Sequence, residues 1–271
     1  MSQDREPLPS RVEGLPELPP EAVALLDSGL AGVHLGDLPP FVRQGLIDHL
    51  RLLLTWNQAI NLTAIRDPQA AVREHILDSL SAVELLRARR IDSLLDLGSG
   101  AGYPGVPLAL ALPARRCLLV ESVTKKAVFL STASVQALET GKSNGTIGVF
   151  FGRAETLAAD QRHRERWPAV VARAIAPLGE LAELALPLVA PGGVLVAWKR
   201  RPLDAELLAA GPAIDLLGGA PPEIVPVTLD GLEDHLLVVV EKVRATPPLY
   251  PRDPALRRRQ PLGVADRLPS P

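Results

Sequence analysis

The sequence predicts an α/β protein with a mostly parallel sheet of seven strands, preceded by N-terminal helices. From residue 91 onward, apolar runs of strand length alternate with helical patterns, and a glycine-rich loop follows the first run. Such alternation is typical of parallel strands joined by helical crossovers. Of the 271 residues, 47 % are apolar, so the chain can bury a core of this size.

The chain before the first expected strand divides into two regions. Residues 1–18 are rich in proline and acidic side chains and lack hydrophobic periodicity, so we expect a disordered extension. Residues 19–90 carry apolar residues at helical spacing and are expected to form a helical region. A polar segment interrupts that pattern, and one helix is expected to end near Asn57.

Residues 91–245 form the predicted sheet domain. Strands are expected near residues 91–97, 116–121, 146–151, 169–173, 194–198, 223–228 and 235–241. A short connection separates the last two, which predicts an antiparallel hairpin at the sheet edge. Residues 246–271 follow as a basic tail with five arginines, for which phosphate binding and simple solvation are equal alternatives.

Composition limits the function classes. The formal net charge is −2, which gives no argument from the whole molecule for nucleic-acid binding. The single cysteine, Cys117, excludes an internal disulfide and a thiolate metal cluster, and it falls in an expected buried strand. Neither a secretory leader nor an apolar run of about 18 residues occurs, so we expect a cytoplasmic protein that does not cross a membrane.

The loop over residues 96–105 is expected to bind a nucleotide cofactor. Gly98 and Gly100 let the backbone turn sharply and approach a ligand closely. Glu121 ends the next expected strand about 20 residues later, the spacing of a carboxylate that binds ribose hydroxyls. The loop matches both G-x-G-x-x-G of dinucleotide enzymes and D-x-G-x-G-x-G of S-adenosylmethionine binders, so it leaves the nucleotide open.

Other polar residues favour S-adenosylmethionine over a nicotinamide cofactor. A dehydrogenase needs a proton donor or acceptor, usually His or a Tyr and Lys pair. The chain has only Tyr103, within the loop, and Tyr250, in the tail, and its five histidines are scattered. Methyl transfer to a neutral lone pair needs no dedicated base. A nicotinamide-dependent reductase is kept as the alternative.

Two further segments are expected to contact the cofactor. Ala154 and Glu155 follow the third expected strand, where the adenine ring would lie, although Glu155 could instead cap the next helical turn. Arg173 ends the fourth expected strand, at the edge where ligands bind in open α/β sheets. A surface ion pair is the alternative for Arg173.

Several motifs, in one order, resemble the bacterial RsmG (GidB) family. They are Asn61-Leu62-Thr63-Ala64-Ile65, His75-x-Leu77-Asp78-Ser79-Leu80, the glycine loop, Glu121-Ser122 with Lys125-Lys126, and Ala172-Arg173-Ala174 before Pro177. The family consists of S-adenosylmethionine-dependent methyltransferases that act on N7 of a guanine in 16S ribosomal RNA. The resemblance implies a Rossmann-like seven-stranded methyltransferase fold with N-terminal helices, and direct in-line methyl transfer without a dedicated base.

The resemblance also implies the cofactor contacts and the partner. The implied contacts are Gly98, Tyr103, Glu121, Ser122, Val123, Ala154, Glu155 and Arg173. The implied partner is 16S rRNA or a small-subunit particle. We expect the protein to be a monomer. The sequence identifies no catalytic residue and no metal ligand set. A noncatalytic RNA-binding factor that retains the fold is the second alternative.

Candidate RNA-facing residues are less defined. His75, Asp78 and Ser79 share one helical turn and could order an RNA-facing surface or pack between helices. Lys125-Lys126 and Lys199-Arg200-Arg201 could meet phosphate or be solvated. Trp56 and Trp198 are the candidates for stacking on a base.

Overall fold

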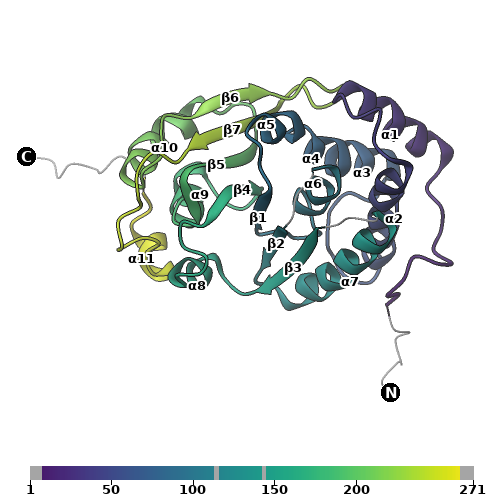
Figure 1. Ribbon diagram of the computed structural model, residues 1–271, viewed down its shortest axis with the longest axis horizontal. Coiled ribbons are helices and arrows are strands. Elements are labelled where there is room, and N and C mark those ends of the chain that lie inside the picture. Colours follow the sequence, from purple (N-terminus) through teal and green to yellow (C-terminus); the bar gives the residue numbers. More distant parts are fainter. Residues whose placement is uncertain (1–7, 113–115, 142–144, 263–271) are drawn as a thin grey trace, which may run out of the picture.

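A seven-stranded sheet forms the centre of the protein, with helices on both faces (Figure 1). The computed structural model describes residues 8–112, 116–141 and 145–262. The strands are β1 (Ser93–Leu97), β2 (Arg116–Glu121), β3 (Thr146–Phe151), β4 (Trp167–Arg173), β5 (Val189–Arg200), β6 (Glu223–Pro226) and β7 (His235–Glu241). Their order is β3-β2-β1-β4-β5-β7-β6, and β7 alone runs antiparallel to both of its neighbours. The predicted α/β class and the C-terminal hairpin are confirmed.

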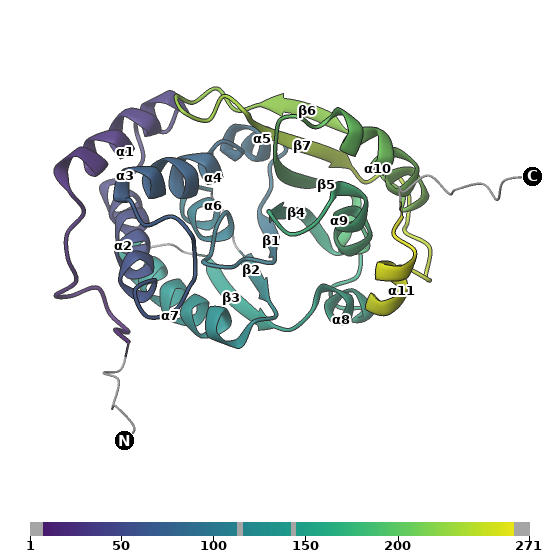
Figure 2. The same ribbon diagram turned by 180° about the vertical axis from the view of Figure 1, so that it is seen from behind.

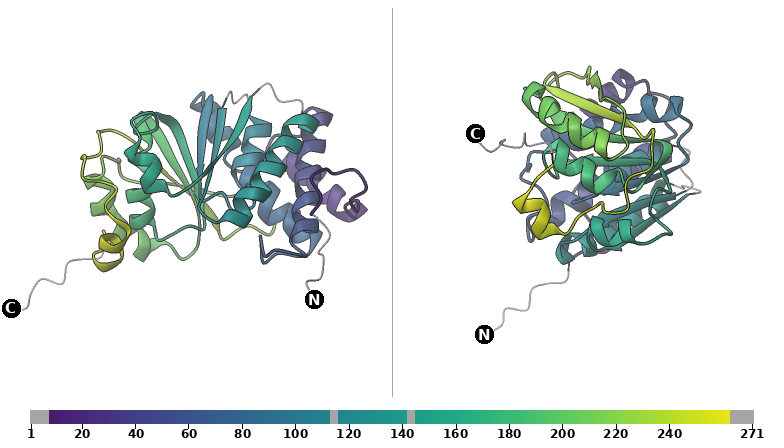
Figure 3. Two further views of the ribbon diagram at one scale, coloured as in Figure 1. Left: turned by 90° about the horizontal axis from the view of Figure 1, so that it is seen from below. Right: turned by 90° about the vertical axis from the view of Figure 1, so that its left-hand side faces the viewer.

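The helices form two layers of different thickness (Figure 3). On one face lie α1 (Pro20–Gly32), α2 (Pro40–Trp56), α3 (Pro68–Ala71), the π-helix η1 (Val72–Leu77), α4 (Asp78–Leu80), α5 (Val83–Ala88), α6 (Gly105–Ala111) and α7 (Thr124–Gly141). On the other lie α8 (Ala154–Ala159), α9 (Leu178–Ala185), α10 (Asp204–Leu216) and α11 (Pro254–Arg259). Helix α2 ends at Trp56, with Asn57 as its C-cap, as expected.

Two hydrophobic cores hold these layers to the sheet. Successive side chains of a strand point to opposite faces. On β1, Leu94 therefore packs in the core under α2, α6 and α7, whereas Leu95 and Leu97 pack in the core under α8, α9 and α10. The N-terminal helices share the first core with α6 and α7. The proposed boundary at residue 90 stays a prediction.

Strand β5 is longer than the sequence predicts. The strand was expected near residues 194–198, yet β5 begins at Val189, runs through Pro191-Gly192-Gly193 and ends at Arg200. The Gly192 N–H donates to the Lys242 carbonyl at 2.7 Å, and the Lys242 N–H donates to the Gly193 carbonyl at 2.9 Å. Gly192 has φ +80°, and the register against β4 shifts between Val189 and Val194, so these glycines form an irregularity within β5 that pairing with the segment after β7 holds in place.

Residues 8–18 differ from the expected disordered extension. Leu18 is buried, and Leu8 and Leu15 pack against the first core. The Trp56 indole N–H donates to the Pro9 carbonyl at 2.8 Å. Because these contacts are long-range, the lack of local periodicity concealed them. Residues 1–7 lie outside the described residues.

Two of the five arginines in the basic tail differ from both expected alternatives. Arg252 forms an ion pair with Glu183 at 2.7 Å, and Arg257 is ion-paired with Glu155 and Glu180. Figures 1 and 2 show α11 beside α8, and residues 246–262 run along this side of the sheet. Arg252 and Arg257 are therefore held by ion pairs within the protein. Arg258 and Arg259 are exposed, and Arg267 lies outside the described residues.

Over the described ranges, no helix is both long and apolar enough to cross a membrane.

Candidate cofactor and acceptor site

Two cavities open at the carboxyl ends of the parallel strands, and Gly98 lines both. The first cavity has a volume of about 530 Å³ and the second about 310 Å³. The predicted cofactor residues on the first are Gly98, Gly100, Tyr103 and Arg173. Those on the second are Gly98, Ser122, Ala154 and Glu155. A ligand that reaches from one cavity into the other must pass Gly98.

The glycine loop turns in a backbone conformation that residues other than glycine rarely adopt. Gly98 has φ +67°, and Gly100 and Gly102 also have positive φ. A Cβ added at Gly98 would lie 2.9 Å from Cδ1 of Ile175. Glycine therefore permits both the positive φ of the turn and the close packing of Ile175 against the loop.

Glu121 ties this loop to the end of β2. Its carboxylate is buried, with Oε2 accepting the Gly100 N–H at 3.0 Å and Oε1 accepting the Val123 N–H at 2.7 Å. Each carboxylate oxygen has a second lone pair. Glu121 thus fixes the loop and retains capacity to accept a ribose hydroxyl, a role that stays a prediction.

Asp96 supports the loop from below. It is fully buried, and its Oδ2 accepts the Gly105 N–H at 3.0 Å. Its Oδ1 has no hydrogen-bond partner in the described part of the chain. Burial raises the pKa of this carboxyl from 3.8 to about 7, so the acid is partly protonated near neutral pH.

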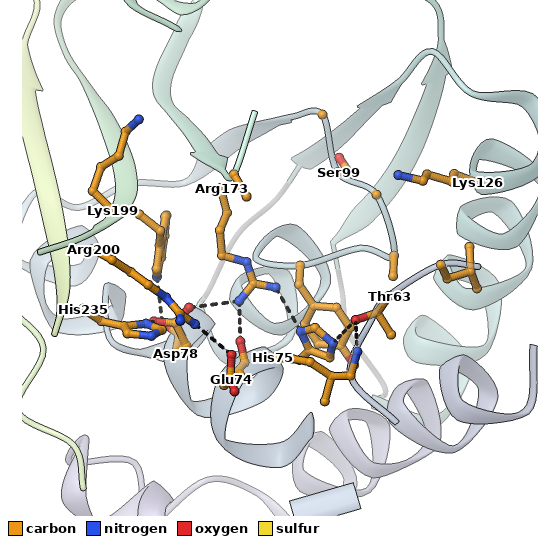
Figure 4. Close-up of a pocket in the computed structure, with 18 residues that line it drawn as sticks. Thr63, Glu74, His75, Asp78, Ser99, Lys126, Arg173, Lys199, Arg200 and His235 are labelled. Carbon is orange, nitrogen blue, oxygen red and sulfur yellow. Dashed lines mark hydrogen bonds and ion pairs between the residues drawn. The ribbon is translucent and has the colours of Figure 1, made fainter. Parts of the chain in front are cut away.

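Arg173 is the centre of a polar network in the first cavity (Figure 4). Its Nη1 donates to Asp78 Oδ2 at 3.0 Å and to the Glu74 carbonyl at 2.6 Å, and its Nη2 lies 3.3 Å from His75 Nδ1. His235 Nδ1 lies 2.8 Å from the other oxygen of Asp78. The Arg173 side chain is 17 % exposed, so this is a cavity network and not a surface ion pair.

The N-terminal helices supply one wall of the first cavity. Glu74 and His75 belong to the π-helix η1, a geometry frequent at functional sites. His75 Nε2 lies 2.9 Å from Thr63 Oγ1. Burial, the largest cause, lowers the pKa of His75 to about 3, so the ring is neutral and accepts at Nδ1 from Arg173. His75 and Asp78 therefore shape the cavity and also join the helices to β4.

Tyr103 is stacked between two histidines. Its ring centroid lies 4.5 Å from that of His49 and 4.9 Å from that of His75. The phenol is buried and has no hydrogen-bond partner among the residues described, and burial raises its pKa. Tyr103 thus contributes a rigid, stacked ring to the wall of the first cavity.

Val123 and Glu121 lie apart from the two cavities. Val123 is 47 % exposed and lines a third cavity of about 260 Å³ with Lys125 and Lys126. Lys126 lines the first cavity as well, so the two are adjacent. A direct cofactor contact from Val123 stays a prediction.

Several RNA-facing candidates have partners within the protein. Lys199 pairs with Glu206 at 2.6 Å, and Arg200 with Glu74 at 2.8 Å. The two candidates for stacking on a base, Trp56 and Trp198, are both buried. Trp198 lines the first cavity, and its indole N–H donates to the Asp78 carbonyl at 2.8 Å. Trp56 lies in the core, so it is unavailable for stacking on a base.

Sequence reasoning missed Arg257 and Thr63 as cavity residues. Thr63 was part of a quoted motif but received no role, and it lines the first cavity. Arg257 lines the second cavity from a segment expected to be a tail. No local pattern links Arg257 to Glu155, which is 102 residues earlier in the chain. Across the described ranges, no cluster of three or more His, Cys, Asp or Glu residues could hold a metal ion.

Comparison with known proteins decides the family. The family model described as rRNA small subunit methyltransferase G (GidB) matches residues 43–230. The chain belongs to the rRNA small subunit methyltransferase G family. A member from Roseiflexus sp. (strain RS-1) is 42 % identical over 78 % of this chain and 87 % of its own length. A member from Pelotomaculum thermopropionicum is 39 % identical over 79 % of this chain and 88 % of its own length.

Solved methyltransferase structures are more distant from this rRNA small subunit methyltransferase G chain. Trm1 from Pyrococcus horikoshii, in complex with S-adenosyl-L-methionine, is 14 % identical, with a TM-score of 0.47 over 64 % of this chain and 56 % of its own. The resemblance to the RsmG (GidB) family stated from the motifs is confirmed by the family model and the relatives.

Proposed function

We propose that the protein transfers a methyl group from S-adenosylmethionine to N7 of a guanine in 16S rRNA of the small ribosomal subunit. The observation that carries this proposal is the pair of cavities meeting at Gly98, with Glu121 at the adjacent strand end. Family membership supports the reaction class. A cofactor in one cavity and an acceptor base in the other would meet beside the glycine loop.

The second cavity fits the adenosine part of the cofactor. Ser122, Ala154 and Glu155 line it, and Gly98 lines both this cavity and the first. Glu121 lines neither cavity but accepts the N–H of Gly100, which lines the first, and it would also accept from the ribose hydroxyls, as expected for a carboxylate at this strand end. The amino-acid part would reach Gly100 and Tyr103, where Arg173 offers a cation to its carboxylate.

The first cavity fits the acceptor guanine. S-Adenosylmethionine supplies an electrophilic methyl group when bound. Guanine N7 has a lone pair and no proton, so the protein needs to align the base and exclude water, without a general base. Thr63, Tyr103 and Arg173 present hydrogen-bonding groups toward this space, and Asp78 keeps Arg173 oriented. The carboxylates of Glu74 and Asp78 also lie near the positive charge that develops on the methylated ring.

The basic side chains near the two openings support RNA as the substrate. Lys126 lines both the first and the third cavity, and Lys125 lines the third. Lysines in this place would hold phosphates flanking the target nucleotide. A ribosomal substrate places the enzyme in the cytoplasm. The protein is proposed to act as a monomer.

The test is transfer of labelled methyl groups to defined RNA. Purified protein, labelled S-adenosylmethionine, and 16S rRNA or small subunits from cells lacking the protein should yield one N7-methylguanine, absent from the untreated RNA. A Gly98→Asp variant is the matched control, because its side chain would meet Ile175 and strain the glycine loop. Cofactor binding without RNA methylation would instead support the noncatalytic RNA-binding alternative. Binding of NAD(P)H in place of S-adenosylmethionine would support the reductase alternative.

A further inference from the structure

Helix α11 closes one side of the second cavity. Arg257 on this helix lines the cavity, and its side chain is 6 % exposed. Figures 1 and 2 show α11 beside α8, whose first turn carries Glu155. A segment 102 residues further along the chain than Glu155 thus supplies part of the wall.

Two carboxylates hold the Arg257 guanidinium. Nη2 is hydrogen-bonded to Glu155, and Nη1 donates to Glu180 at 3.1 Å. Both acids line the same cavity. The Nε–H of Arg257 is buried and has no acceptor in the part of the chain that the structure describes. A buried donor without an acceptor costs free energy, so a ligand that brings an acceptor here would be favoured.

The segment that carries Arg257 is anchored away from the cavity. Arg252 donates from its backbone N–H, Nε and Nη2 to the buried carboxylate of Glu183, at 2.7–2.9 Å. Arg164 donates to three carbonyl oxygens within residues 246–250, at 2.8–3.2 Å. These contacts hold the segment in place, so Arg257 is presented before any ligand binds.

We propose that Arg257 is a specificity-determining residue of the adenine subsite. Its Nε–H donates to a ring nitrogen of the base, and its terminal nitrogens hold the Glu155 carboxylate where it accepts from the exocyclic amino group. Arginine only donates and an ionised carboxylate only accepts, so the pair matches a 6-aminopurine better than a 6-oxopurine. This inference rests on the proposed function, because it takes adenine as the occupant of the second cavity.

The test measures the affinity of the full chain for ligands that share the adenine end. Calorimetric titration would use S-adenosylhomocysteine, adenosine and S-inosylhomocysteine, which has a 6-oxopurine. In Arg257→Gln, affinity for S-adenosylhomocysteine and for adenosine should fall by the same factor, about tenfold or more. The preference for the 6-amino over the 6-oxo ligand should fall as well. Arg258→Gln, at an exposed position on the same helix, should leave these values unchanged.

Arg252→Gln separates a contact with the base from a role in holding the segment. It breaks the Glu183 pair, which lies outside the second cavity. It should lower the melting temperature while keeping the preference for the 6-amino ligand. If Arg252→Gln and Arg257→Gln reduced that preference equally, Arg257 would have only a structural role and the inference would be overturned.

Three further outcomes complete the test, and the last two separate the inference from the proposed function. If Arg257→Gln does not fold, Arg257→Lys takes its place, since it keeps the charge and removes the Nε donor; unchanged affinity in that variant would overturn the inference. If the wild-type chain binds S-adenosylhomocysteine and the variants bind it equally well, the inference fails and the proposed function stands. If the wild-type chain does not bind S-adenosylhomocysteine, both fail.

Discussion

Replacing Asp96 with asparagine is expected to stabilise the protein at mildly alkaline pH and to have little effect in acid. The Asp96 carboxyl is fully buried below the glycine loop, and burial raises its pKa from 3.8 to about 7. Asparagine keeps a side-chain oxygen that can accept the Gly105 N–H, and it carries no charge. The variant therefore resembles the protonated acid at every pH.

The magnitude follows from proton linkage. Between pH 3.8 and about 7, folded Asp96 holds a proton that the unfolded chain has released. The stability that this group contributes is complete below pH 3.8 and is lost as the pH rises through about 7. At about 1.4 kcal/mol per pH unit, the whole window amounts to about 4 kcal/mol, of which about 3 kcal/mol falls between pH 5 and 7.

Urea unfolding followed by circular dichroism at pH 5 to 8 would measure this effect. The quantity to compare is the difference between variant and wild type, because burial lowers the pKa of His49 to about 4 and of His75 to about 3. Those two groups change the wild-type stability in the opposite direction, and the difference cancels them. Asp92→Asn, at an exposed position beside β1, is the control. A pH-independent difference for Asp96→Asn would refute the reasoning.

Three further predictions concern the loop and its neighbours. Gly98→Asp should abolish cofactor binding measured by calorimetry, because a side chain there meets Ile175 and requires a strained φ of +67°; unchanged affinity would count against the assigned loop. Glu121→Ala should raise the cofactor Kd about tenfold or more and largely spare kcat at saturation, whereas a loss confined to kcat would contradict the ribose role. Burial lowers the pKa of His49 from 6.5 to about 4, so the neutral ring contributes its full stability above pH 6.5, and about 3 kcal/mol of that stability is lost as the pH falls to about 4. The free energy of unfolding of the wild type, measured by urea titration relative to His49→Gln, should therefore fall between pH 6.5 and about 4.

Local patterns were sufficient to predict the sheet. Strands β2, β3 and β7 have the bounds expected from their apolar runs, because strands of a sheet covered by helices carry nearly continuous apolar stretches. The glycine loop and Glu121 were predicted as neighbours because their spacing follows from one strand, loop, helix and strand in succession. Both are properties of short stretches of sequence.

The composition of the tail, by contrast, predicted the wrong environment for two of its arginines. The arginines at 252 and 257 look like solvated or phosphate-binding residues when only their neighbours in sequence are considered. In the fold they meet Glu183, Glu155 and Glu180. Residues 8–18 gave the same error, since their partners lie on α2 and α7.

The sequence by itself therefore determined the α/β class, the succession of strands and the loop that carries the candidate cofactor site. Only the tertiary structure decided that Arg173, Asp78 and His235 share one network, and that Arg257 closes the second cavity. Hydrophobic periodicity is repeated within each element and can be read locally. The pairing of two charges far apart in the chain depends on which elements the sheet topology brings together, and no short stretch of sequence records that.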